Sequence, residues 1–290
     1  MINPRMQYKK RKIEIHGKQM AYVDVGEGEP IVFLHGNITS SFMYRNIIPY
    51  VEPFARCIAV DNIGQGDSDK LEGSMYRLKD HQKFTDGFMD AMGLGGNVTI
   101  MVHDWGAQLG FTWANKNRGA MKAIAQMQGV LGDFKWSHWP EQVQVLFKRF
   151  RSPEGEEMVL GENRFVENVL PAMTLRKLTE DEMNEYRRPY QNPGEDRRPT
   201  LTWPREIPIE GYPSDVLRVI EENTRWLAEC PLPKLFINSE PGAVLIGEHR
   251  DMVRRWPNLT EVTVSGLHYI HEDSPDDIGR ALADWYKSIS

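Results

Sequence analysis

Residues 98–107 read VTIMVHDWGA, the most informative stretch of the chain for its fold. The first five residues form an apolar, partly β-branched run, which is typical of a strand covered on both faces. Helical spacing begins at Gly106, so a tight turn lies between them and includes Asp104. A strand, a tight turn and a helix in this order predict a nucleophile elbow, with aspartate where serine is more usual. Asp104 could instead cap the helix, but the small Gly106 and Ala107 would let the helix cross the strand closely and favour the nucleophile.

Similar runs recur on both sides of this stretch. We expect eight strands, at residues 12–15, 19–25, 31–34, 57–60, 98–102, 123–127, 235–237 and 262–264. Helical spacing over residues 78–92 and 106–117 lies between strands, and residues 278–289 follow the last one. This alternation predicts an α/β protein, with a mostly parallel central sheet flanked by helices.

The alternation is interrupted between residues 132 and 232, where aromatic and methionine residues are separated by Glu/Arg-rich segments and prolines. We expect residues 132–214 to form an inserted helical cap, followed by a Pro-rich return segment to about residue 232. Residues 1–131 and 233–290 then form the two parts of the core. Because ligands of open α/β sheets bind outside the carboxyl ends of the strands, the cap is expected to act as a lid there.

Composition excludes several classes of function. The 290 residues include 35 Lys and Arg against 41 Asp and Glu, a net charge of −6, which argues against a nucleic-acid partner. No window approaches 18 uncharged apolar residues, and the basic run at residues 9–12 leads into an alternating segment rather than a signal peptide. We therefore expect a soluble, cytoplasmic protein without membrane contact. Two cysteines, Cys57 and Cys230, are too few for a disulfide framework and lack metal-site spacing.

Further candidate site residues follow other predicted strands. Gly36, two residues after the third strand, permits a sharp turn that would aim backbone N–H groups above the sheet, as an oxyanion hole requires, although any strand-to-loop turn could read this way. A general base working near neutral pH is best supplied by histidine. His268 and His271 both follow the last strand. We favour His268, which closely follows a glycine turn, because His271 lies in an acidic run typical of a solvated helix start.

An acid that orients the histidine should follow the strand after the nucleophile or the next one. The first position holds Gln128, which has the right size but no charge. Glu240, after the next strand, is a possible substitute, although it could equally be a surface turn residue before Pro241 and Gly242.

Together these features resemble the haloalkane dehalogenase branch of the α/β-hydrolase fold, and the similarity runs over nearly the whole chain. The motifs that carry it are residues 35–37 (HGN) with 39–41 (TSS), 64–69 (GQGDSD), 103–106 (HDWG), 198–205 (RPTLTWPR) and 272–275 (EDSP). Coelenterazine-oxidising luciferases of the sea-pansy type share most of these motifs. Residues 132–140, which lack the extra residue of the luciferases, and residues 240–243 (EPGA) favour the dehalogenase side.

The resemblance implies a role for each motif residue. Asp104 would displace a halide from carbon and form a covalent alkyl ester, and His268 would activate the water that hydrolyses it. The indole N–H of Trp105 and the side-chain amide of Asn37 would bind the halide, while the backbone N–H groups of the same two residues form the oxyanion hole. No metal ion, flavin or nucleotide cofactor is implied. The partners are a small halogenated hydrocarbon, water and the halide product, and the chain is expected to be a monomer or weak homo-oligomer.

Gln128 stands where this branch usually has glutamate, so the hydrolytic step is expected to be slow unless Glu240 serves instead. Three functions therefore remain open at this point. They are a haloalkane dehalogenase-like hydrolase, a cofactor-independent coelenterazine luciferase, and a degenerate member of the fold that only binds a ligand. Asn62 and Gln65 are polar where the family usually has apolar residues, and the sequence offers no physical account of them.

Overall fold

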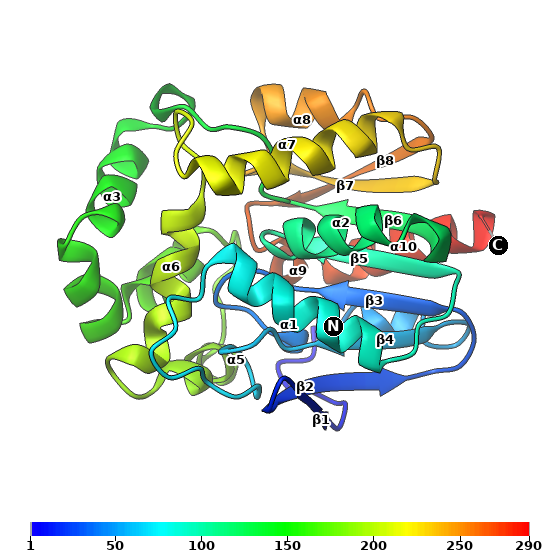
Figure 1. Ribbon diagram of the computed structural model, residues 1–290, viewed down its shortest axis with the longest axis horizontal. Coiled ribbons are helices and arrows are strands. Elements are labelled where there is room, and N and C mark those ends of the chain that lie inside the picture. The colour runs from blue at the N-terminus through cyan, green and yellow to red at the C-terminus, as the bar shows by residue number, and fades with distance from the viewer. Residues whose placement is uncertain (1, 290) are drawn as a thin grey trace.

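All eight predicted strands form, and they join in one sheet (Figure 1). The computed structural model describes residues 2–289. The strands are β1 (Arg11–Ile15), β2 (Lys18–Val25), β3 (Pro30–Leu34), β4 (Arg56–Val60), β5 (Val98–His103), β6 (Met121–Met127), β7 (Lys234–Pro241) and β8 (Leu259–Gly266). Their order across the sheet is β1-β2-β4-β3-β5-β6-β7-β8. β2 pairs antiparallel with β1 and β4, and every other pairing is parallel, so the prediction of a mostly parallel sheet is confirmed.

The register of the parallel strands brings their carboxyl ends together. Leu34 of β3 pairs with Val102 of β5, and His103 of β5 pairs with Met127 of β6. The residues that follow these three strands therefore emerge at the same edge of the sheet, next to one another.

Side chains of the central strands alternate between two apolar layers, as the strand period of two requires. In β3, Val32 and Leu34 pack into one layer, while Ile31 and Phe33 pack into the other. Helices α1 (Leu78–Ala91), α2 (Gly106–Lys116), α7 (Ser214–Glu229) and α8 (Gly247–Val253) contribute to the first layer. Helices α9 (Ile270–Asp273) and α10 (Pro275–Ser288) contribute to the second, which lies behind the sheet in Figure 1.

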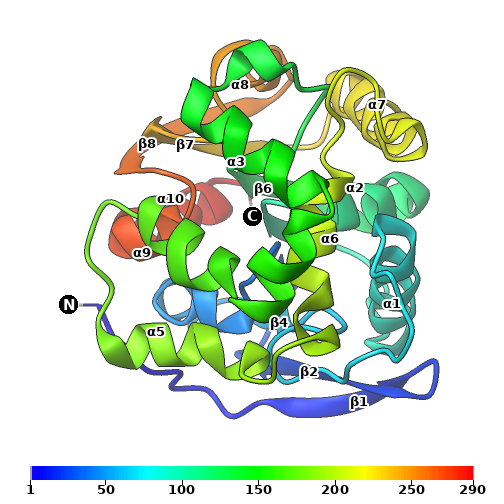
Figure 2. The same ribbon diagram turned by 90° about the vertical axis from the view of Figure 1, so that its left-hand side faces the viewer.

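The inserted segment between β6 and β7 forms a helical cap over the carboxyl ends of the strands (Figures 1 and 2). Its α-helices are α3 (Glu141–Arg151), α4 (Leu170–Ala172), α5 (Glu180–Arg187) and α6 (Arg198–Glu206). Residues Glu156–Gly161 and Phe165–Val169 add two short π-helical segments, which the sequence pattern did not predict.

The expected return segment is not an irregular stretch of chain. It contains the 16-residue helix α7, which packs in the first apolar layer. The side-chain amide of Asn223 on α7 donates to Gln108 Oε1 at 3.0 Å and to Thr112 Oγ1 at 2.9 Å on α2. Both cysteines are buried and unpaired. Within residues 2–289, none of the helices combines the length and apolar character needed to cross a bilayer.

Candidate active site

The predicted elbow lies between β5 and α2. Asp104 has a φ of 52°, a left-handed conformation that non-glycine residues adopt mainly in tight turns and strained sites. The first residue of α2, Gly106, passes so close to β3 that a Cβ atom there would lie 2.1 Å from the carbonyl oxygen of Leu34. Trp105 is the N-cap residue of α2, and no side chain caps this helix end. The capping interpretation of Asp104 is therefore wrong, and its carboxylate is free to face the space above the sheet.

A second loop, after β3, holds one oxygen of this carboxylate. The backbone N–H of Asn37 donates to Asp104 Oδ2 at 2.7 Å, and the backbone N–H of Trp105 also donates to the carboxylate. Gly36 is required for this approach, since a Cβ atom there would lie 2.2 Å from Asp104 Oδ2. The two N–H groups expected to form an oxyanion hole therefore both donate to this carboxylate.

Burial controls the charge of the carboxylate. Asp104 is 5% exposed, and burial raises its pKa to about 6, although the N–H groups of Asn37 and Trp105 partly oppose this rise. At pH 7 the group is mostly ionised, so it can act as a nucleophile without a base to activate it.

His268 is the histidine that the structure brings to Asp104. Its Nε2 lies 3.6 Å from Asp104 Oδ1, the oxygen that faces away from the Asn37 N–H. Burial, followed by the nearby His103 and His271, lowers the pKa of His268 well below its usual value, so the ring is neutral at pH 7. Its Nδ1 atom is buried and has no hydrogen-bond partner among residues 2–289.

Two further histidines surround this ring. His103 Nε2 lies 2.9 Å from the carbonyl oxygen of His268, and because a carbonyl only accepts, His103 carries its proton there. His271 is fully buried rather than solvated as its acidic neighbours suggested. The Tyr186 hydroxyl donates to Glu272 at 2.6 Å, so His271 Nε2 must donate to that hydroxyl at 3.0 Å. Both rings are thus neutral donors, and neither supplies a negative charge to His268.

Gln128 follows β6 and also has a left-handed φ, of 46°. Its Oε1 atom accepts from three backbone N–H groups of residues 243–245, at 2.9–3.3 Å. Its Nε2 donates to Ser239 Oγ at 2.6 Å, and that hydroxyl donates to the carbonyl oxygen of Leu267. The amide is therefore connected to the backbone next to His268 and does not bind the imidazole ring. Sequence reasoning missed Ser239, because a serine near the end of a strand carries no signal of its own.

Glu240 does not serve as the acid that is missing at position 128. The side chain is 62% exposed and lies 3.7 Å from Arg250, while the Nδ1 atom of His268 is buried and unpartnered. The candidate site therefore contains the predicted nucleophile and the predicted base, but among residues 2–289 no carboxylate binds Nδ1 of that base.

The proposed halide-binding side chains are both buried next to Asp104. The Trp105 indole stacks on Trp203 of α6, with ring centroids 4.8 Å apart and an angle of 21° between the planes. The Asn37 side chain donates to the carbonyl oxygen of Thr200, also on α6, at a long 3.3 Å. Both groups therefore lie where the cap meets the core.

Asn62 and Gln65 brace the loop after β3. Asn62 donates through Nδ2 to the carbonyl oxygen of His35 at 2.8 Å, and its backbone N–H donates to the ring of that residue. Gln65 Nε2 donates to the carbonyl oxygen of Gly36, and its Oε1 accepts from the indole N–H of Trp203 at 3.3 Å. These two polar residues thus hold the loop of residues 35–37 after β3, here called the oxyanion loop, and connect it to the cap. Only their long-range partners reveal this role.

Two hollows differ in their relation to this site. One, of about 590 Å³, lies within the cap and is lined mainly by apolar side chains, including Phe147, Phe150 and Val169. Its wall includes Met173, whose carbonyl oxygen accepts from the backbone N–H groups of His268 and Tyr269. This hollow therefore borders the loop that carries the base.

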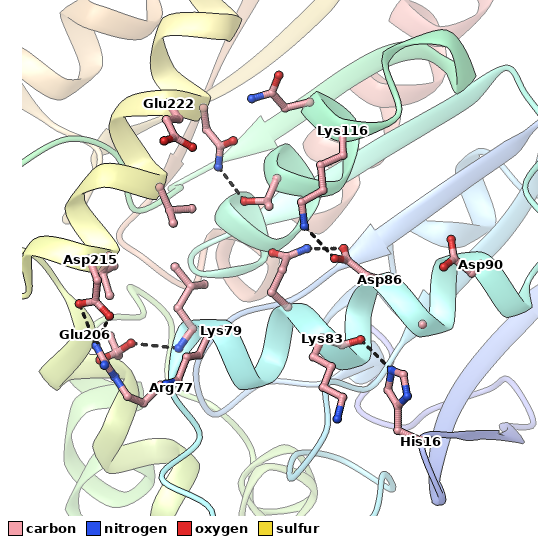
Figure 3. A pocket seen from close by; sticks show the side chains of 18 residues that line it. His16, Arg77, Lys79, Lys83, Asp86, Asp90, Lys116, Glu206, Asp215 and Glu222 are labelled. Carbon is pink, nitrogen blue, oxygen red and sulfur yellow. Dashed lines mark hydrogen bonds and ion pairs between the residues drawn. The ribbon is translucent and has the colours of Figure 1, made fainter.

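The other hollow, of about 750 Å³, lies between α1, α2 and α7 (Figure 3). It contains none of the predicted site residues. Several of its charged side chains pair with one another, as Arg77 does with Asp215 at 3.0 Å and Lys116 with Asp86 at 2.9 Å. Such paired surface charges offer no reactive group.

The sheet order, the elbow and the oxyanion loop define an α/β hydrolase, and a family model described as "alpha/beta hydrolase fold" matches residues 29–275. The chain is 50% identical over 283 residues to a haloalkane dehalogenase from Sphingobium indicum, covering 97% of this chain and 96% of that protein. A crystal structure of a haloalkane dehalogenase from Bradyrhizobium elkani superposes with a TM-score of 0.92 at 35% identity, covering 98% of this chain and 99% of that one. The chain belongs to the haloalkane dehalogenase family of this fold.

The chain is also similar to a protein named for a different activity. The coelenterazine h 2-monooxygenase from Renilla reniformis is 38% identical over 266 residues, covering 89% of this chain and 84% of that protein.

Proposed function

We propose that this protein cleaves carbon–halogen bonds of small halogenated hydrocarbons by forming a covalent ester on Asp104. One observation carries the proposal. Asp104 Oδ2 is held by the N–H group of Asn37, whereas Oδ1 faces His268 Nε2 at 3.6 Å without a hydrogen bond. The two carboxylate oxygens therefore have different roles available to them.

In the first step Asp104 Oδ1 attacks the carbon that bears the halogen. A C–O bond forms, the carbon–halogen bond breaks, and the halide leaves with the electron pair. The indole N–H of Trp105 and the side-chain amide of Asn37 are the neutral donors that would stabilise the developing anion without trapping it. The amide needs to give up only its long bond to Thr200.

In the second step a water molecule attacks the ester carbonyl carbon of Asp104 while His268 takes its proton. The former Oδ2 atom becomes the oxyanion, and it already accepts from the N–H group of Asn37, while the N–H group of Trp105 donates to the same carboxyl group. Collapse of this intermediate releases the alcohol, whose oxygen takes the proton from His268. Asp104 is left as the neutral acid, and the second proton of the water is lost to solvent, which restores the carboxylate.

We further propose that the second step is slow. His268 would have to become an imidazolium in a buried position, while its Nδ1 atom has no carboxylate partner among the described residues. The low pKa of His268 points the same way, because a weak base gains protons reluctantly. In a serine protease the comparable change of acid to amide costs roughly 10⁴ in turnover.

Intact-mass spectrometry of the chain mixed with a bromoalkane tests both parts of the proposal. The expected result is a burst of bromide equal to the amount of protein, a chain heavier by one alkyl group, and slow decay of that adduct. Asp104→Ala should give neither burst nor adduct. A chain that stays unmodified while bromide is released steadily would contradict the slow ester hydrolysis.

Two other functions would each give a different result. The similarity to a coelenterazine monooxygenase supports a luciferase as the second candidate, and light emission on adding coelenterazine in air would favour it. Saturable bromoalkane binding with neither adduct nor bromide would favour a protein that only binds its ligand. The higher identity to a protein named as a dehalogenase supports carbon–halogen cleavage first.

A monomer or weak homo-oligomer remains our prediction for the assembly.

A further inference from the structure

Three potential metal ligands meet where the chain enters the cap, away from the candidate active site. A ring nitrogen of His138, a ring nitrogen of His249 and a carboxylate oxygen of Glu248 all lie within 4.8 Å of one another. Among residues 2–289, no other set of three His, Cys, Asp or Glu side chains is grouped in this way. His138 precedes α3, whereas Glu248 and His249 lie in the first turn of α8, so the cluster joins the cap entrance to the core.

His249 is already held as a ligand would be. It is 7% exposed, and its Nε2–H donates to the carbonyl oxygen of Asp133 at 3.1 Å. With the proton on Nε2, the Nδ1 atom of the neutral ring carries a lone pair. An imidazole whose second nitrogen donates to a backbone carbonyl is the usual arrangement at metal sites.

The surroundings of this ring are also shaped for it. Phe134 packs on it with ring centroids 4.4 Å apart. Gly132, which has a φ of 76°, approaches so closely that a Cβ atom there would lie 2.8 Å from His249 Nε2. The ring is therefore fixed in place, and the other two ligands are the ones that must adjust.

His138 and Glu248 are free to do so. His138 Nε2 lies 3.2 Å from Glu248 Oε1, and their side chains are 24% and 61% exposed. The ring centroids of His138 and His249 are 5.6 Å apart. Binding a metal ion through Nε2 moves the ring proton of His138 to Nδ1, which gives up only a long 3.3 Å bond from the backbone N–H of Lys135.

We propose that His138, Glu248 and His249 bind one divalent transition-metal ion of the zinc class, with water as the fourth ligand. Imidazole nitrogens and a carboxylate oxygen suit Zn²⁺, and three protein ligands with one water form an open tetrahedral site. The ligands are not cysteines, so the low cysteine count does not bear on this site. Because the ligands come from residues 132–140 and from α8, the bound ion pins the cap entrance to the core.

Calorimetric titration of the full chain with Zn²⁺ tests the site. We expect saturable binding of one ion per chain and a higher melting temperature with the ion bound. His138→Ala and Glu248→Gln, which change accessible side chains, should each weaken binding by more than about tenfold, since even losing a partner of a ligand costs 10–100-fold. The matched control is His16→Ala, an exposed histidine of the first hairpin, which should bind as the parent chain does.

Failure to saturate below millimolar Zn²⁺ would overturn the proposal, as would unchanged affinity in the His138 and Glu248 variants. Hydrogen exchange provides a second readout that does not depend on a variant. Zn²⁺ should slow amide exchange in residues 132–140 and 247–253. Slowed exchange confined to other parts of the chain would mean that the ion binds elsewhere.

Discussion

The carboxyl group of Asp104 combines burial with two backbone donors, and this combination determines its useful pH range. Burial raises its pKa to about 6, so lowering the pH converts the nucleophile to the neutral acid. We predict that the rate of ester formation falls about tenfold between pH 7 and pH 5. Rapid-quench measurement of the bromide burst over this range checks it. A burst rate that stays constant to pH 5 would contradict the assigned titration.

Gln128 occupies a position that is well suited to a carboxylate. Three backbone N–H groups of residues 243–245 point at its oxygen, and such donors favour an anion. We predict that Gln128→Glu shortens the lifetime of the alkyl ester by about 10²- to 10⁴-fold, because a carboxylate supplies the missing countercharge to His268. The rate of ester formation should change little.

The control for this substitution is Gln128→Leu, which has a similar size and no charge. Its ester should persist at least as long as in the parent chain. Intact-mass spectrometry over time measures the lifetimes directly. If the Glu variant and the parent chain lose the alkyl group at the same rate, Gln128 does not limit hydrolysis.

Single residues were predictable where local chain context was enough. Asp104 directly follows a strand, and parallel strands bring the residues after their ends to one edge, whereas the roles of Asn37 and Trp105 were predicted from the family resemblance. The partners of Gln128 could not be foreseen, because its donors lie more than a hundred residues further along the chain. The burial of His271 was hidden for the same reason.

The crossing of α2 and β3 depends on the absence of a side chain at Gly106. Since a Cβ atom there would meet the Leu34 carbonyl oxygen at 2.1 Å, we predict that Gly106→Ala lowers the free energy of unfolding by at least about 2 kcal/mol. Gly119→Ala is the control, because nothing lies within 4 Å of the corresponding Cβ position, and it should stay within about 0.5 kcal/mol. Urea denaturation measures both, and equal losses would refute the steric argument.

Whole elements were predicted best where both faces are covered. The central strands are continuous apolar runs because they pack against helices on both sides. β8 spans Leu259–Gly266, whereas only residues 262–264 were predicted. The prediction was too short because an edge strand has several exposed side chains and therefore no continuous apolar run. The π-helical segments of the cap have no sequence signal, since π-helical and α-helical spacing differ little over one turn.

The attachment of the cap to the core includes a buried ion-pair network. Arg45, after β3, binds Glu272 of α9 at 2.7 and 2.8 Å and Glu182 of the cap helix α5 at 3.0 Å. All three are at most 1% exposed at the side chain. We predict that Arg45→Met costs about 3–5 kcal/mol of unfolding free energy, because the two buried carboxylates lose their fully buried cation and keep only Arg176, whose side chain is partly exposed.

Arg280 is the matched control for this network. It pairs with Asp277 on the exposed face of α10, where both side chains are 58% exposed. Arg280→Met should therefore cost less than about 1 kcal/mol. Urea denaturation of the two variants side by side is the measurement, and a similar loss in both would argue against the network.

The sequence predicted the arrangement of the molecule, a sheet with an inserted cap, but not how the cap is held. Its links to the core, such as the bond from Trp203 to Gln65, join residues far apart in the chain. No local periodicity records such contacts, so the interior of the cap and the region around His268 had to come from the structure.

Isotope labelling distinguishes attack by Asp104 from direct attack by water. In a single turnover in ¹⁸O-labelled water, with protein in excess over bromoalkane, the oxygen of the alcohol should come from Asp104 and be unlabelled. The label should instead appear in the peptide that contains Asp104, after the ester has been hydrolysed. Labelled alcohol together with an unlabelled peptide would show that water displaces the halide directly, and the covalent mechanism would be wrong.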